Sequence, residues 1–406
     1  ADHAEKAIDI FCQFFICPLF TASGTSREVQ AVNSENSKNL SNDSRRRLQI
    51  LKSVGDPNHE YTKFSTGCAK TLKGGDDNVR EALLTFHRYH YRPEAMVVVL
   101  VGPQSLDQLK EWAIPRFDGL KNRWLEQECY EGVEKIIVES GSSAKQKEVL
   151  HNPAFHPKVQ NDKWPVLITS LPLRDMRKLV LLFPLPPVLD RPDDSPTKLL
   201  SHLLGHEGRG SCFAALQNEG LITALCTGSR ISDQNQCLFQ VDISLTCKGE
   251  EHWERVVNII FDYCRLLQDQ TTKAAAAKHD KKPHHINALQ HLQNLWDEMA
   301  RMSQIDFHNA SPGPAYNLAT SLARAVTRDG IQKCRSAGYM LNETTHTLPL
   351  LSIMEYAQLL NPQNVIVERC SRSAWEQITK IHEQKLTQNQ NDIFGLKKEK
   401  WYGVQY

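Results

Sequence analysis

The sequence lacks an excess of charge of either sign. Its 406 residues include 48 lysines and arginines and 47 aspartates and glutamates, which gives a formal net charge of +1. Proteins that bind nucleic acid or an anionic membrane surface through electrostatics usually concentrate positive charge. The balance therefore predicts neither nucleic acid nor a membrane as a partner. The hydrophobic content of 40% is typical of a globular protein with a packed core.

Long hydrophobic runs are also lacking. The longest uninterrupted apolar stretch, residues 95–101, is far shorter than the roughly 20 residues that a membrane-spanning helix needs. The apolar stretch 8–20 is interrupted by polar residues and proline, and it has neither the basic start nor the cleavage site of a signal peptide. Because the chain opens with Ala1, inside a predicted helix, rather than with Met, we expect an N-terminal segment to precede it.

No pair of cysteines has the CxxC spacing. The count is 11, an odd number, and the two closest are Cys12 and Cys17. Disulfide frameworks and zinc fingers need paired, regularly spaced cysteines. We therefore expect reduced thiols that are mostly buried as small hydrophobic side chains, in a protein of the cytoplasm.

The first part of the chain predicts helices and one strand. Apolar residues recur at helical spacing over 4–17, and Thr25 to Glu28 has the pattern of a capping box that opens a helix running to about Val54. Further helices are predicted over 78–91 and 105–116. Between them, residues 95–101 are rich in β-branched side chains and stop at Gly102-Pro103, which predicts a buried strand.

The remainder of the chain mixes strands and helices without regular alternation, so the predicted fold class is α+β. Weak patterning predicts a first domain over 1–130, a connecting segment over 131–165 and a second domain over 166–406. Residues 270–290, which include His284 and His285, are predicted to form a surface insertion rather than a metal site. Within the second domain, strands are predicted over 178–185, 221–226, 237–247 and 364–368, and helices over 197–205, 211–219 and 252–267.

Two carboxylates share one face of a predicted helix. Glu28 and Glu35 lie seven residues apart, which is about two helical turns, and Ala31 and Val32 lie on the same face. Burying two acids beside apolar side chains is costly unless a positive group pairs with them, and a divalent metal is one such group. The alternative is that Glu28 completes the capping box after Thr25 and that Glu35 is solvated.

Several ordered motifs resemble the insulysin-type metallopeptidases of the pitrilysin, or inverted-zincin, family. Residues 26–39 resemble the segment of those enzymes that supplies the third zinc ligand. The resemblance covers most of the chain and is weakest at 120–165 and 270–290. Its other motifs are Gly55-Asp56-Pro57-Asn58-His59, Lys63-Phe64-Ser65-Thr66-Gly67, Thr71-Leu72, Phe86-His87, Tyr91, the predicted strand ending at Gly102, His202-Leu203-Leu204-Gly205-His206-Glu207-Gly208, and Glu399-Lys400-Trp401-Tyr402-Gly403-Val404-Gln405-Tyr406.

The resemblance implies a zinc cofactor and peptide substrates. In that family, two histidines of an HxxEH helix and a downstream glutamate hold zinc, and the HxxEH glutamate polarises the zinc-bound water. Glu35 matches the third zinc ligand. Glu28, seven residues earlier on the same face of the helix, matches the acidic residue that supports the site.

The histidine pair and the general base are missing from this chain. None of the 16 histidines begins an HxxEH or an HExxH, and the run from His202 to His206 lacks the glutamate of both arrangements. One carboxylate does not hold catalytic zinc, which takes three protein ligands plus water. We therefore assign no catalytic residue, and we predict that the chain as it stands has no peptidase activity.

The second half resembles the non-catalytic repeat beside the catalytic domain of that family. The resemblance implies two repeats of a sheet-plus-helices domain, the first of them incomplete. It also implies an exosite at which an extended peptide pairs with a strand edge, with His202, Gly205, His206 and Gly228 as the matching positions. The alternative for these residues is ordinary helix capping and turn geometry.

Two functions remain open from the sequence. The chain is either part of an insulysin-type zinc metalloendopeptidase, or a catalytically inactive homologue that binds peptides or serves in assembly. An HxxEH motif in upstream sequence favours the first, and a genuine start at this position favours the second. The sequence leaves open whether a second half-shell follows Tyr406.

Overall fold

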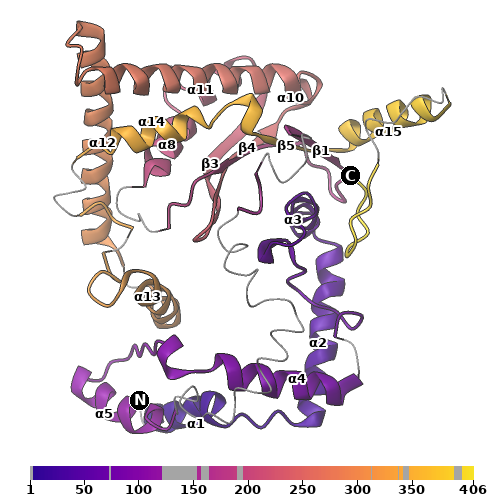
Figure 1. The fold of residues 1–406 in the computed structure, drawn as a ribbon, viewed down its shortest axis with the longest axis vertical. Helices are drawn as coiled ribbons and strands as arrows, with labels where there is room; N and C mark the ends of the chain where they lie inside the picture. The colour runs from indigo at the N-terminus through magenta and orange to yellow at the C-terminus, as the bar shows by residue number, and fades with distance from the viewer. Residues whose placement is uncertain are drawn as a thin grey trace. The chain divides into compact units, whose positions relative to one another are not determined.

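The computed structural model describes residues 3–72, 75–120, 153–156, 164–189, 195–311, 313–336, 338–341, 347–387 and 396–406. The fold is α+β, as predicted, and the described residues hold a five-stranded sheet (Figure 1). The chain divides into two compact units. The first unit comprises residues 1–38, 65–147 and 307–337, and the second comprises 39–64, 148–306 and 338–406. The predicted division at 131–165 and the predicted two repeats stay predictions.

The helices and strands have the following bounds. The helices are α1 (Ala4–Ile16), α2 (Ala22–Leu40), α3 (Asp43–Ser53), η1 (Glu60–Thr62), α4 (Gly75–His90), η2 (Pro93–Ala95), α5 (Leu106–Phe117), α8 (Pro196–Gly205), α9 (Cys212–Asn218), α10 (Cys247–Glu251), α11 (Trp253–Ala276), α12 (Pro283–Asn309), α13 (Ala315–Asp329), α14 (Leu350–Gln358), η7 (Pro362–Asn364) and α15 (Arg372–Thr387). The strands are β1 (Val166–Ser170), β2 (Lys178–Leu185), β3 (Ile222–Ser232), β4 (Cys237–Leu245) and β5 (Ile366–Cys370).

The sheet of the second unit has the strand order β1-β5-β2-β4-β3. β1 pairs with β5 in parallel, whereas β5, β2, β4 and β3 pair antiparallel in that order. The register places Leu181 of β2 opposite Val241 of β4 and Val367 of β5. The sequence predicts β2 with its observed bounds, and β5 within two residues, but not β1.

The second unit has a hydrophobic core on each face of its sheet. Leu179, Leu181 and Phe183 of β2 belong to the larger core, which includes buried side chains of α8, α9, α11, α12 and α14. Val180 and Leu182 belong to the smaller core, which includes Ile50 and Leu51 of α3. Because successive side chains of a strand point to opposite faces, β2 is buried on both sides and reads as a continuous apolar run.

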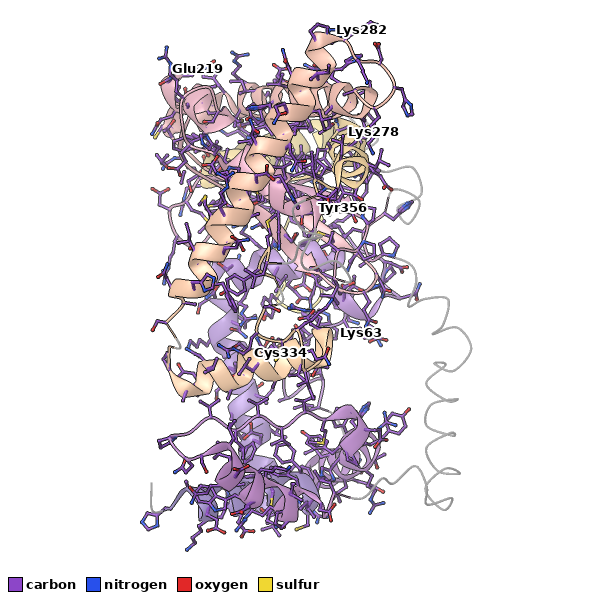
Figure 2. All side chains as sticks on the ribbon, turned by 90° about the vertical axis from the view of Figure 1, so that its left-hand side faces the viewer. Lys63, Glu219, Lys278, Lys282, Cys334 and Tyr356 are labelled. Atoms are coloured by element: carbon purple, nitrogen blue, oxygen red, sulfur yellow. The ribbon has the colours of Figure 1, made fainter. Side chains whose placement is uncertain are left out.

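Helix α14 is tied to the larger core through one buried tyrosine. Tyr356 is buried, and its hydroxyl donates to the carbonyl oxygens of Pro186 and Pro187 at 3.3 and 3.1 Å. Its position within the second unit can be followed in Figure 2.

The single helix predicted from Thr25 to Val54 is wrong. α2 begins three residues earlier, where the Thr21 hydroxyl accepts the Gly24 N–H at 3.1 Å, so Thr25 lies inside the helix. α2 ends at Leu40, and α3 begins after Asn42, whose side chain accepts the Arg45 N–H at 3.1 Å. An asparagine in this capping position offers the backbone an alternative to continuing the helix.

The strand predicted over residues 95–101 is also absent. Residues 96–101 are assigned to no strand, and Val97, Val98 and Val101 are 37–42% exposed. Val97 and Val98 would point to opposite faces of a strand, so neither face of this segment is covered. A β-branched run forms a strand only when a neighbouring strand supplies its hydrogen bonds, and no described residue does so here.

The insertion predicted over 270–290 is mostly helical. α11 continues to Ala276 and α12 begins at Pro283, which leaves only a short turn between them. Lys278 and Lys282 mark this turn at the upper end of Figure 2. Alanine has the highest helix propensity, which suits the alanine run to the end of α11, and Ala274 is fully buried.

The first unit is held by a few contacts between helices. Arg116 of α5 bonds Glu5 of α1 at 2.7 Å, and the His87 ring of α4 lies 2.9 Å from the carbonyl oxygen of Phe15. Cys12 is the only buried hydrophobic side chain among the described residues of this unit. No described helix combines the length and apolar character needed to span a bilayer.

Candidate peptide-binding edge and carboxylate helix

The turn after α8 is shaped by one histidine. α8 ends at Gly205, and the extended backbone of His206 (φ −65°, ψ 135°) ends the helix. The Nδ1 atom of His206 accepts the Gly208 N–H at 3.1 Å, which folds the chain back. Ser211 then caps α9 by accepting the Ala214 N–H at 3.1 Å. The residues from 205 to 211 therefore form a defined turn between two helices.

Two hydroxyl groups fasten α8 to β3. The Ser201 Oγ donates to the Thr227 carbonyl oxygen at 2.9 Å, and the Thr227 Oγ1 donates to the Ser201 carbonyl oxygen at 2.8 Å. A Cβ on Gly205 would lie 2.7 Å from Thr227 Oγ1, so only glycine permits this close approach. We call the Ser201–Thr227 pair the hydroxyl clamp.

The predicted exosite residues gather at this junction. His202, Gly205 and His206 lie at the end of α8, and the His202 and His206 ring centroids are 6.0 Å apart. Gly228 follows Thr227 on β3, and a Cβ there would lie 3.8 Å from Ser201 Oγ. A bulky side chain at Gly228 would therefore press on α8. The structure thus brings the four positions together, and their role in binding stays a prediction.

β3 forms one end of the strand order, so it pairs with β4 on one side only within the described residues. Its side chains at Thr223, Ala224, Cys226 and Ser229 are exposed. The sequence analysis missed Ser201 and Thr227, because a serine in a helix and a threonine in a strand carry no signal of their own. Only their paired hydroxyl contacts reveal their role.

Two of the thiols near this turn are buried and are not candidate nucleophiles. Cys212 stands at the start of α9, and Cys264 lies on α11. Burial raises the pKa of both thiols to about 12, so they stay protonated at neutral pH. A reactive cysteine needs the opposite shift, which favours the thiolate. Cys212 and Cys264 therefore serve as buried side chains of the core.

Glu28 and Glu35 lie on α2 as predicted, but both side chains are exposed. Ala31 is exposed and Val32 is half-buried, so the expected apolar stripe around the acids is weak. No three histidine, cysteine or acidic side chains cluster as a metal site in the described part of the chain. These residues alone therefore do not fit catalytic zinc, and no chemical step is derived from them.

Comparison with known proteins defines the family. Residues 78–279 match the family described as "Peptidase M16 inactive domain". The whole chain aligns with the A-factor-processing enzyme of Saccharomyces cerevisiae at 30% identity over 408 residues, which is 33% of that protein. The chain belongs to the M16 peptidase family.

Other M16 comparisons agree. Insulin-degrading enzyme-like 1, peroxisomal, of Arabidopsis thaliana is 34% identical over 330 residues, covering 80% of this chain and 29% of that protein. The crystal structure of pitrilysin shares the fold, with a TM-score of 0.71 and 22% identity over 91% of this chain and 35% of that one. The predicted resemblance is thus confirmed. The chain spans about a third of the length of these relatives.

Proposed function

We propose that this chain is the peptide-binding part of an M16 metallopeptidase, and that an extended peptide adds to the outer edge of β3 beside the α8 turn. The observation that carries the proposal is the position of β3 at the end of the sheet, with the hydroxyl clamp fixing the adjacent turn. An edge strand offers unpaired N–H and C=O groups that accept another strand.

This mode of binding has physical consequences. Backbone hydrogen bonds do not depend on side-chain identity, so we expect little sequence preference. Ordering an extended peptide costs conformational entropy that a short edge only partly offsets, so we expect weak affinity. The names of two relatives, which refer to A-factor processing and to insulin degradation, support peptides as the ligand class.

The test is fluorescence anisotropy with a labelled, unstructured peptide and the purified chain. A scrambled peptide should bind with similar affinity. The same peptide with alternate backbone amides methylated should bind at least tenfold more weakly, because it loses edge-strand donors. Equal binding of the methylated and unmethylated peptides would show that no strand is added.

A protein variant locates the binding site. Thr227→Val keeps the shape of the side chain but removes one donor of the hydroxyl clamp, so the α8 turn should loosen and peptide affinity should fall severalfold. Ser232→Ala, at an exposed position near the end of the same strand, is the matched control and should bind as the wild type does. Circular dichroism establishes that both variants are folded.

We further propose that Glu35 is a zinc ligand and Glu28 its support in a longer chain that supplies an HxxEH helix. Their shared helix face and their exposure support this role. In such a chain, Glu35→Gln should lower the zinc content strongly, whereas Glu28→Gln should weaken zinc binding by roughly 10–100-fold, as for residues that support a ligand. Elemental analysis measures both variants, and unchanged zinc in Glu35→Gln excludes the ligand role.

The alternative proposal is a catalytically inactive homologue that binds peptides or serves in assembly. It shares the β3 edge with the main proposal and differs in lacking a catalytic partner segment. Upstream sequence without an HxxEH motif would favour it. For either function we propose the cytoplasm, because all cysteines among the described residues are free, which suits a reducing compartment.

A further inference from the structure

The last ten residues form a small hairpin with its own hydrogen bonds. Lys397 and Tyr406 exchange two backbone bonds of 3.0 Å, and the Glu399 N–H donates to the Val404 carbonyl oxygen at 2.8 Å. The tip turns at Gly403, whose φ of +64° lies in the left-handed region that favours glycine. We call residues 397–406 the C-terminal clasp.

A buried carboxylate makes the clasp rigid. The Glu399 side chain is 2% exposed, and its two oxygens accept the N–H groups of Trp401 and Tyr402 at 2.8 and 2.6 Å. Charged acceptors make stronger hydrogen bonds than neutral ones. The aromatic rings of residues 401 and 402 are therefore presented on a fixed backbone.

The clasp is anchored to α3 and the smaller core. Val404 is buried in the same core as Ile50 and Leu51 of α3. The Ser53 Oγ, at the end of α3, donates to the Tyr406 hydroxyl at 3.0 Å. The clasp thus packs on the segment that leads from α3 to Phe64.

The clasp holds one aromatic residue at the end of that segment, Phe64. The Phe64 ring stacks on the Trp401 ring, with centroids 4.7 Å apart and planes 12° apart, and meets the Tyr402 ring edge-on. One residue earlier, the Lys63 carbonyl oxygen accepts a bond of 2.9 Å from the buried Lys52 ammonium. Phe64 is the last residue of this stretch in the second unit, and the chain continues at Ser65 in the first unit.

The turn that follows Phe64 contacts α2, the helix that carries Glu28 and Glu35. The Ala69 N–H donates to Asn33 Oδ1 of α2 at 3.2 Å, and Gly67 lies against Val32. The turn itself is closed by Thr71, whose Oγ1 accepts the Cys68 N–H at 2.8 Å. Only Ser65 and Thr66 separate Phe64 from Gly67 along the chain.

We propose that the C-terminal clasp is a conformational device that fixes Phe64 and thereby steadies the turn of residues 65–72 on the helix that carries Glu28 and Glu35. Trp401 is its positioning residue. The proposal stands on the stack and on the turn's bonds to α2, and it is independent of the peptide-binding function and of zinc. It links residues 397–406 to a turn that contacts α2, more than three hundred residues earlier in the sequence.

Hydrogen–deuterium exchange of the full chain tests the device. Trp401→Ala should raise exchange in peptides covering residues 63–72 by roughly three- to tenfold, the range expected for the loss of one aromatic pair. Phe64→Ala removes the other half of the stack and should give the same pattern. Trp401→Phe keeps a stacked ring and should restore most of the protection.

One control variant and two contrary results complete the test. Tyr316→Ala removes an exposed aromatic ring on α13 and should leave residues 63–72 unchanged. Exchange that rises in Trp401→Ala only within residues 397–406 would overturn the coupling. A rise spread evenly over β2 and β4 would show general destabilisation and would also overturn it.

Discussion

At the residue scale, Glu368 of β5 is a buried charge that joins three elements. Only 3% of its side chain is exposed, and it accepts hydrogen bonds from both Nε and Nη2 of Arg47 on α3. The guanidinium of Arg230 on β3 lies 3.5 Å away. Burial disfavours the charge of Arg47, but Glu368 beside it outweighs this and raises the pKa of Arg47. The pair thus fixes α3 on the sheet.

Glu368→Gln should therefore destabilise the protein strongly. The variant leaves two partly buried guanidinium groups without an anion, and breaking a buried pair in this way costs about 3–5 kcal/mol. Urea denaturation measures the loss. Arg47→Met combined with Glu368→Leu should cost less than Glu368→Gln, because it removes both charges of the main pair. A loss below about 1 kcal/mol in Glu368→Gln would contradict the assigned role.

The buried thiols predict how stability depends on pH. The folded-state pKa of Cys212 and Cys264 is about 12, whereas thiols of an unfolded chain titrate near 8.5. Above about pH 8.5 the unfolded chain releases protons that the folded chain retains. The free energy of unfolding therefore falls as pH rises, by about 1.4 kcal/mol per pH unit for each thiol, and their contribution is complete below pH 8.5.

Urea denaturation between pH 7.5 and 9.5, under reducing conditions, tests this dependence. The wild type should lose stability over this range more steeply than a variant carrying Cys212→Ala and Cys264→Ala. If the free energy of unfolding falls equally in the two proteins over this pH range, burial does not raise the pKa of these thiols.

The sequence predicts some properties of single residues, but not which residues they contact in the fold. The odd cysteine count without CxxC predicts free, mostly buried thiols; the described cysteines are free, but only five of the ten are buried. The spacing of Glu28 and Glu35 placed both on one helix, but their exposure depends on what packs beside α2. The Ser201–Thr227 and Arg47–Glu368 contacts join residues far apart in the chain, and no local pattern marks them.

At the element scale, the break between α2 and α3 depends on one asparagine. Asn42→Ala removes the acceptor for the Arg45 N–H and should lower the free energy of unfolding by about 1 kcal/mol. Ser44→Ala changes an exposed residue in the first turn of α3 and is the matched control, with an expected change within about 0.5 kcal/mol. Chemical denaturation measures both. Equal effects of the two substitutions would remove the capping role from Asn42.

Strands were predictable where burial and pairing agree with the local pattern. β2 reads as an apolar run because both of its faces are covered, and β4 alternates from Phe239 to Leu245, so the sequence predicts both strands close to their observed bounds. Residues 95–101 have an equally strong local pattern, but a strand also needs a partner, which a local pattern does not reveal. β1 is short and pairs with β5 from two hundred residues away, so its preceding sequence looked like part of a connecting segment.

At the scale of the whole molecule, the chain combines a well-packed second unit with the strand edge at which we propose that peptides bind. The sheet and its two cores hold β3 at one end of the strand order, where the proposed peptide would add. The described residues supply no metal cluster, and the full sequence has no HxxEH or HExxH. The proposed function therefore separates peptide capture, assigned to the edge of β3, from hydrolysis, for which this sequence holds no HxxEH or HExxH motif.

A time course of fluorescence anisotropy tests that separation most directly. A labelled, unstructured peptide is mixed with increasing concentrations of the 406-residue chain in the presence of zinc and followed for hours. The account predicts that anisotropy rises with protein concentration and then stays constant, because the peptide is bound and remains intact. No rise would contradict the peptide-binding edge, and a rise followed by a fall that a chelator prevents would contradict the absence of catalysis.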